Sequence, residues 1–163
     1  MRDPEIIRQG AQAFGNQCIV LGMDALEVDA CDATPSGYEI VVKGGRERTR
    51  IDALEWAQRA EELGAGEIGL NSIDTDGTRD GYEIELTAMI ARGVGIPVIA
   101  SGGAGEPRHL AEVLTRGEAD AALIASMVHF GDWDIAGIKR ELEKTGARIR
   151  DLGKLPPEPA ARS

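Results

Sequence analysis

Short apolar runs alternate along this chain with longer segments whose apolar residues recur at helical spacing. The short runs end near small or polar residues, and the run that begins at Ile96 is rich in β-branched residues, which is typical of a buried strand. The longer segments are amphipathic, as helices that pack against a sheet are. The predicted strands cover 18–23, 67–71, 96–101 and 119–125. The predicted helices cover 4–14, 52–63, 82–91, 107–116 and 135–144, with a short helical turn at 126–130.

The segment 28–50 departs from this alternation. Tyr38–Lys43 is strand-like, Gly44 and Gly45 form a turn, and the residues from 46 to 50 are polar. This pattern predicts a surface hairpin inserted before the helix at 52. Residues 155–163 are rich in proline, alanine and charge, so we expect a disordered tail after a folded domain at 1–154.

Strand, loop and helix recur four times after one unpaired helix, which predicts an α/β fold with a parallel sheet. Right-handed crossovers place the carboxyl ends of all parallel strands on one rim, where the polar loops meet. Both a four-stranded open sheet and half of a (βα)8 barrel fit this pattern. A complete barrel needs about 200 residues or more. The chain has 163 and is too short for one.

The strand at 96–101 runs into a glycine-rich loop, and Glu106-Pro107 then marks a helix start. Unpaired backbone N–H groups at a helix N-terminus favour an anion such as phosphate. The alternative is that the glycines only permit a tight turn. Asp24 follows another apolar strand, where a partly desolvated carboxyl can act as a general acid. The alternative is an ordinary solvated aspartate that caps the following loop.

The composition of the chain limits the classes of molecule that it is expected to bind. The formal charge of −10 argues against nucleic acid, which recruits Lys and Arg. It leaves room for a small phosphorylated ligand held by backbone donors. No apolar run approaches the roughly 20 residues that span a membrane, and the N-terminus lacks the apolar core of a signal peptide. With only two cysteines, a cytoplasmic location is expected. His109 has no metal-ligand partners at suitable spacing and is interpreted as a surface residue.

Several motifs together carry a family resemblance that extends from about residue 4 to residue 150. They resemble the C-terminal half of the cyclase subunit of imidazole glycerol phosphate synthase, of histidine biosynthesis. The motifs are Asp-Ala-Leu-Glu-Trp at 52–56, Gly-Ala-Gly-Glu-Ile at 64–68, Ser-Ile-Asp-Thr-Asp-Gly-Thr at 72–78, Ile-Ala-Ser-Gly-Gly-Ala-Gly at 99–105 and His-Phe-Gly at 129–131.

The resemblance implies half of a (βα)8 TIM barrel and a lyase. The family joins ammonia from a glutaminase subunit to a phosphoribulosyl formimino aminoimidazole carboxamide ribotide, without a cofactor or metal. The products are imidazole glycerol phosphate and aminoimidazole carboxamide ribotide. Asp24 matches one of two catalytic aspartates, the general acid. Glu67 matches a charge that gates the ammonia tunnel. The implied substrate and phosphate contacts are Asn71, Ser72, Asp76, Gly77, Ser101, Gly102, Gly103, Ala125 and Ser126.

The residues of the family's N-terminal half, including the other catalytic aspartate, have no counterpart here. A half barrel exposes sheet edges and an apolar inner face. We therefore expect pairing with an N-terminal half barrel or self-association, and little cyclase activity from the chain alone. Two alternatives remain open. One is a non-catalytic, self-associating half-barrel module that binds phosphate. The other is a related phosphoribosyl isomerase of the same pathway.

Overall fold

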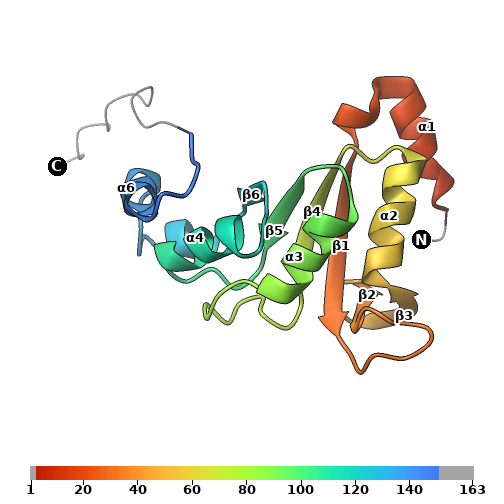
Figure 1. Ribbon diagram of the computed structural model, residues 1–163, viewed down its shortest axis with the longest axis horizontal. Coiled ribbons are helices and arrows are strands. Elements are labelled where there is room, and N and C mark those ends of the chain that lie inside the picture. Colours follow the sequence, from red (N-terminus) through yellow and green to blue (C-terminus); the bar gives the residue numbers. More distant parts are fainter. Residues whose placement is uncertain (1–2, 151–163) are drawn as a thin grey trace.

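A computed structural model describes residues 3–150, and Figure 1 colours its elements along the chain. Six strands form one sheet in the order β3-β2-β1-β4-β5-β6. The strands are β1 (Val20–Glu27), β2 (Tyr38–Val42), β3 (Glu47–Asp52), β4 (Glu67–Ser72), β5 (Val98–Ser101) and β6 (Ala121–Ala122). The helices are α1 (Glu5–Phe14), α2 (Ala53–Leu63), α3 (Ile84–Gly93), α4 (Pro107–Thr115), α5 (Ser126–His129) and α6 (Ile135–Thr145), with a 3-10 turn η1 (Asn16–Cys18).

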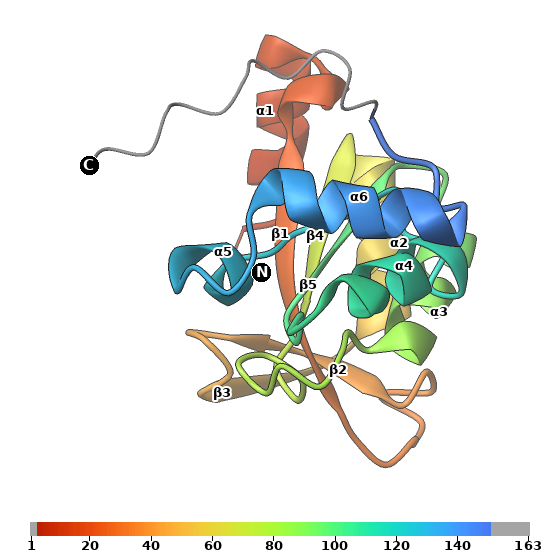
Figure 2. The same ribbon diagram turned by 90° about the vertical axis from the view of Figure 1, so that its left-hand side faces the viewer.

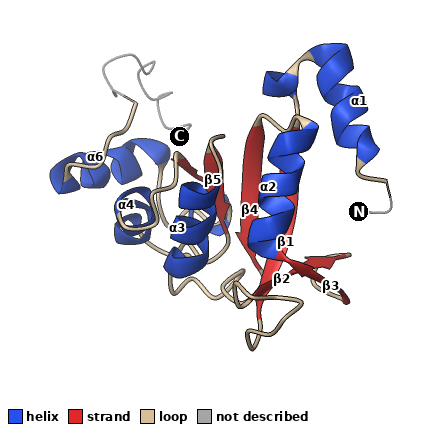
Figure 3. Cartoon of the chain, turned by 45° about the vertical axis from the view of Figure 1, so that its right-hand side comes forward, coloured by secondary structure: helices blue, strands red, loops and turns tan. Residues whose placement is uncertain are grey.

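The strands β1, β4, β5 and β6 are parallel neighbours. A helix follows β4, β5 and β6 directly, whereas the hairpin of β2 and β3 lies between β1 and α2. Helices α2 and α3 lie side by side over one face of β1 and β4 (Figures 1 and 3). Helix α4 continues the row and contacts α6. The arrangement confirms the prediction of four parallel βα units and is that of a partial TIM barrel.

The two faces of the parallel sheet differ in burial. Along β4, Ile68 and Leu70 are buried toward the helices, whereas Glu67 and Asn71 on the other face are only half-buried. Val20 pairs with Glu67 on that second face and is 54% exposed. The face away from the helices is thus open to solvent, although some of its residues are large and apolar.

Two apolar clusters hold the helices to the sheet. The larger one packs β1, β2, β4 and β5 against α2 and α3, and it includes Trp56, Ile68, Leu86 and Ile90. The smaller one joins α4 and α6 to the far end of the sheet through residues such as Met127. Burial of this apolar surface is the main stabilising contribution in such a fold.

The predicted hairpin forms from β2 and β3 and precedes α2. Its first strand is buried in the sheet, so only the prediction that it lies on the surface was wrong. Strand β2 pairs antiparallel with Asp24–Glu27, so β1 runs four residues beyond its predicted end. Ile40 and Val41 are each 2% exposed. At its other end the predicted strand was too early, because Cys18 lies in η1. Figure 2 shows β2 and β3 beneath the parallel strands.

Other boundaries follow the prediction more closely. Helix α4 begins at Pro107 and α6 is followed by Gly146 in the left-handed conformation, as expected. The last strand is shorter than predicted and is confined to β6. His109 is 2% exposed, so its interpretation as a surface residue was wrong. The predicted disordered tail at 155–163 lies outside the described residues.

The start of α2 depends on one buried carboxylate, that of Asp52, which is 1% exposed. Its Oδ1 accepts hydrogen bonds from the backbone N–H groups of Leu54 and Glu55 at 2.9 and 3.1 Å. Its Oδ2 accepts from the N–H of Ser36 at 2.8 Å. Asp52 therefore caps the helix and anchors the loop before β2.

Replacing Asp52 by Ala should lower the free energy of unfolding by about 2–3 kcal/mol, because three backbone N–H groups lose a buried acceptor. Urea unfolding of the purified chain measures this. Asp134→Ala is the matched control, because Asp134 is exposed and its side chain accepts one N–H at the start of α6. The control should lose less than about 1 kcal/mol. Equal losses would contradict the role of Asp52 as an anchor.

Candidate functional site

Three polar side chains lie side by side on the open face, near the carboxyl ends of the parallel strands. Asp24 of β1 pairs in register with Asn71 of β4, which pairs with Ser101 of β5. Residues in register on neighbouring strands point to the same face of a sheet. The Asn71 side-chain amide donates a hydrogen bond to Asp24 Oδ1 at 3.2 Å. The structure therefore brings together three of the residues that the sequence placed at a common rim.

Next to these residues, three loops line a single cavity of about 140 Å³. Its lining includes Asp76 and Gly77 from the loop after β4, and Ser101, Gly102 and Gly103 from the loop after β5. Ala125 and Ser126, which lead into α5, complete this part of the wall. All seven residues were predicted to converge, and they do. We call this cavity the three-loop pocket.

Backbone donors are available at the three-loop pocket. Within residues 3–150, the N–H groups of Gly77, Gly102 and Gly103 make no backbone hydrogen bond. The N–H of Asp76 differs, because it donates to the carbonyl of Ser72 at 3.0 Å. This N–H is therefore already paired within its own loop. The Asp76 carboxylate remains as the polar group of this residue.

Ser72 stabilises the loop and does not line the three-loop pocket. It is 3% exposed, and its hydroxyl accepts from the N–H of Thr75 at 3.4 Å. The resemblance implies a substrate contact at Ser72, but in this structure its hydroxyl satisfies loop backbone. Asn71 is different, because its side chain lies on the rim and contacts Asp24.

Hydrogen bonds between the loops fix the shape of the pocket. The N–H of Gly81 donates to the carbonyl of Gly103 at 2.8 Å. The hydroxyl of Tyr82 donates to the carbonyl of Leu123 at 2.8 Å, which ties the start of α3 to the segment after β6. Burial raises the pKa of Tyr82, so this hydroxyl keeps its proton at any physiological pH.

Sequence reasoning missed one charged residue of the three-loop pocket. Arg79 lines it and forms an ion pair with Asp132, which follows α5. The only signal in the sequence was a basic residue directly after Gly77-Thr78 in an otherwise acidic loop. The arginine places a positive charge beside the glycine N–H groups.

Glu67 lies away from this rim. It begins β4, four residues before Asn71, and pairs in register with Val20 at the amino-terminal end of β1. Its side chain is half-buried, and no ion pair within the described part of the chain involves it. Glu67 thus lies at the opposite end of the sheet from the rim, and its gating role remains a proposal.

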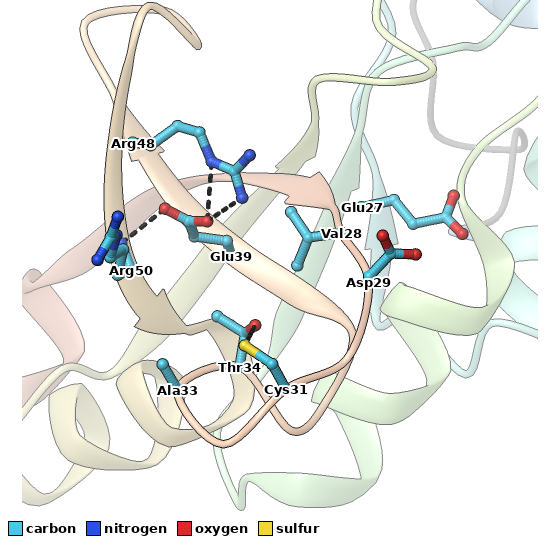
Figure 4. A pocket seen from close by; sticks show the side chains of 9 residues that line it. All are labelled: Glu27, Val28, Asp29, Cys31, Ala33, Thr34, Glu39, Arg48 and Arg50. Atoms are coloured by element: carbon cyan, nitrogen blue, oxygen red, sulfur yellow. Dashed lines mark hydrogen bonds and ion pairs between the residues drawn. The ribbon is translucent and has the colours of Figure 1, made fainter.

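A larger cavity of about 640 Å³ lies where the sequence predicted no site, between the loop after β1 and the hairpin (Figure 4). Glu39 of β2 is its buried charge, at 1% exposure. The carboxylate accepts from Arg48 Nε at 2.9 Å and from the N–H of Arg50 at 2.6 Å. The hydrogen bond from Arg48 is the main cause that lowers the pKa of Glu39, although burial acts in the opposite direction.

The Glu39–Arg48 pair makes stability depend on pH. A carboxyl whose pKa is lowered by folding stabilises the native state above its unfolded pKa, near 4.5, and loses that contribution as pH falls through its folded pKa. Glu39→Gln should therefore lower the urea midpoint at pH 7, and its difference from wild type should shrink below about pH 4. Glu47→Gln, at an exposed position of β3, is the control with little expected effect. A difference that persists unchanged at low pH would contradict this.

Among residues 3–150, no three His, Cys, Asp or Glu side chains gather in a way that could hold a metal ion. None of the described helices is long and apolar enough to cross a membrane. The polar groups at the rim are Asp24 and Asn71, and the three-loop pocket lies beside them.

Comparison with known proteins shows which family the chain is similar to. A family model described as histidine biosynthesis protein matches residues 1–134. The chain is also similar to proteins named imidazole glycerol phosphate synthase subunit HisF. It is 62% identical to that of Desulfatibacillum aliphaticivorans over 93% of this chain and 58% of the relative. It is 64% identical to that of Syntrophobacter fumaroxidans over 91% of this chain and 57% of the relative.

A third such relative, from Desulforapulum autotrophicum, is 60% identical over 92% of this chain and 58% of the relative. The chain thus spans a little over half the length of the curated relatives it matches. The residues that the family model matches include the rim and the three-loop pocket. The match assigns no role to the individual residues. Because the family model covers most of the sequence, the chain belongs to the histidine biosynthesis protein family.

Proposed function

We propose that this chain supplies one part of the cyclase centre of imidazole glycerol phosphate synthase. The proposed reaction joins ammonia to phosphoribulosyl formimino aminoimidazole carboxamide ribotide, and it yields imidazole glycerol phosphate and aminoimidazole carboxamide ribotide. One observation carries the proposal. The Asp24 carboxyl, hydrogen-bonded to Asn71, lies on the same rim as a pocket lined by glycine N–H groups. An acid group beside an anion pocket fits a phosphorylated substrate that needs proton transfer.

The three-loop pocket is proposed to hold one of the two substrate phosphates. Backbone N–H groups of Gly77, Gly102 and Gly103 would donate to it, with the hydroxyls of Ser101 and Ser126. Such donors bind phosphate even in an acidic protein, because the partial positive charges of the N–H groups act on the phosphate at close range. The Asp76 carboxylate repels phosphate but can accept from a ribulosyl hydroxyl. The second phosphate would bind in the part of the relatives that this chain does not span.

Asp24 is proposed as the general acid. Ring closure to an imidazole requires protons at departing oxygen and nitrogen, and a carboxyl on the rim is placed to supply them. The amide of Asn71 orients this carboxyl by donating to Oδ1. Arg79, beside the three-loop pocket, would add positive charge near the bound phosphate.

Ammonia is proposed to arrive from a glutaminase subunit at the opposite end of the sheet. Glu67 begins β4 at that end and is half-buried on the open face. We propose that it gates the passage, with its charged partners in the part of the relatives outside this chain. The open face itself, with Val20 54% and Leu123 50% exposed, would be covered by that same part.

The exposed apolar residues also favour a second candidate. A chain that covers Val20 and Leu123 with a second copy of itself would be a self-associating phosphate-binding module without turnover. The related isomerase receives less support, because the three relatives described above carry the synthase name.

The test is to mix this chain with the remaining part of the Desulfatibacillum aliphaticivorans relative and to follow imidazole glycerol phosphate formation with ammonia as the nitrogen source. The proposed function predicts turnover from the mixture and little from either part. Sedimentation verifies that the two parts assemble. A stable assembly that binds the substrate without turnover would favour the module instead.

A further inference from the structure

His109 is a buried residue that the proposed reaction does not use. It lies in the first turn of α4, where the imidazole is 2% exposed. Its Nδ1 accepts a hydrogen bond from the N–H of Gly105 at 3.1 Å. In a neutral imidazole one nitrogen accepts and the other carries the proton, so Nε2 is the protonated nitrogen. Within the described residues Nε2 has no hydrogen-bond partner, and the nearest carboxylate oxygen, on Glu106, is 3.5 Å away.

The imidazole lies against two loops of the three-loop pocket. A Cβ atom built on Gly81 would be 3.6 Å from His109 Cδ2, so the ring is in van der Waals reach of the loop after β4. That loop is bonded to the loop after β5, through the N–H of Gly81 and the carbonyl of Gly103. Gly105, which the imidazole holds through Nδ1, ends the second loop. One side chain thus contacts both loops from the side away from solvent.

The buried imidazole of His109 lowers the stability of the fold in a way that an apolar side chain would not. Burying an N–H group without a partner lowers stability. Leucine at position 109 would fill similar space without this cost. It would, however, leave the N–H of Gly105 without its acceptor at the point where the glycine loop enters α4. The feature that distinguishes histidine from leucine here is therefore the hydrogen bond to the loop.

We propose that His109 is a positioning residue for the three-loop pocket. Its Nδ1 fixes the Gly105 end of the glycine loop while its ring supports Gly81, and together these contacts hold the loops at the spacing that an anion requires. This inference rests on the proposed phosphate binding for its functional meaning. The hydrogen bond itself can be tested without a ligand.

Three variants of the full chain separate positioning from general packing. His109→Asn places an amide oxygen near the position of Nδ1 and keeps an acceptor for Gly105. His109→Leu fills the site without an acceptor. Val113→Ala, at a fully buried position one turn further along α4, destabilises the same helix without touching the loops. Amide hydrogen exchange by NMR and titration with inorganic phosphate are measured on each.

In His109→Leu, the Gly105 amide should exchange at least about tenfold faster and phosphate affinity should fall about tenfold, as expected for one lost hydrogen bond. His109→Asn should stay within about threefold of wild type in both. Val113→Ala should lower the urea midpoint and leave phosphate affinity unchanged. Wild-type exchange and affinity in the folded Leu variant would overturn the inference.

If His109→Leu does not fold, His109→Gln takes its place, because its longer amide reaches toward Nε2 and misses Gly105. Equal Gly105 exchange in the Asn and Gln variants would then overturn the inference. A wild-type chain whose spectra do not respond to phosphate would refute the proposed phosphate site. The exchange comparison would still decide whether His109 positions the loop.

Discussion

Replacing Gly103 by Ala should destabilise the folded chain by more than about 3 kcal/mol, because strain and overlap act at the same residue. Gly103 has φ of 97°, a conformation that side chains with a Cβ rarely adopt. A Cβ atom there would lie 2.0 Å from the carbonyl oxygen of Gly81. The N–H of the same Gly81 donates to the carbonyl of Gly103, which holds the two loops close together. The backbone of both loops must move to accept it.

Gly77→Ala is the matched control for this substitution. Gly77 lies in the same pocket and has φ of 81°, but no atom lies within 4 Å of its added Cβ. It should therefore cost only the conformational strain, about 1–2 kcal/mol. Urea unfolding followed by the fluorescence of buried Trp56 measures both variants. Similar losses would show that the close approach of the two loops contributes little.

The arrangement of loops around this pocket could be predicted because it follows from topology. Once four short apolar strands alternate with helices, right-handed crossovers place every carboxyl end on one rim. Asp24, Asn71 and Ser101 then fall at the same level by counting along each strand. The glycines at 77, 102 and 103 mark the points where the chain turns sharply after those strands.

The place of the hairpin could not be predicted in this way, because the hydrophobic pattern does not show that β2 pairs with the end of β1. Polar residues at Asp24 and Glu27 looked like a strand end, whereas pairing with β2 extends β1 through both of them. The same pairing buries Glu39, whose charge is accommodated by Arg48 nine residues later. A tertiary contact thus overrode the local preference of a charged residue for solvent.

His109 was misplaced for a different reason. Histidine is a polar residue type, which favoured the surface. Its position in α4 favoured the core, because Val113 lies one turn further along on the same buried side of the helix. Periodicity was the better signal here. The reason a histidine occupies that position became visible only when Gly105 and Gly81 were placed around it.

Asp24→Asn should reduce ammonia-dependent turnover of the assembled cyclase by about 10²- to 10⁴-fold, the usual range for loss of a general acid. The substitution is nearly isosteric, and an asparagine oxygen can still accept the hydrogen bond from Asn71. Packing at the rim is consequently preserved, while the amide cannot supply a proton at neutral pH. The affinity of the three-loop pocket for inorganic phosphate should change less than about twofold, since Asp24 is not among the residues that line the pocket.

The control for this variant is Asp29→Asn, which makes the same change of charge at an exposed position shortly after β1. It should leave turnover near wild type, which separates the role of the Asp24 carboxyl from the loss of one negative charge in an acidic chain. Turnover is measured on the chain assembled with the remaining part of the Desulfatibacillum aliphaticivorans relative. If Asp24→Asn retained full turnover in that assembly, proton transfer would have to come from another group. The hydrogen bond between Asn71 and Asp24 would then serve only to pair the ends of β1 and β4.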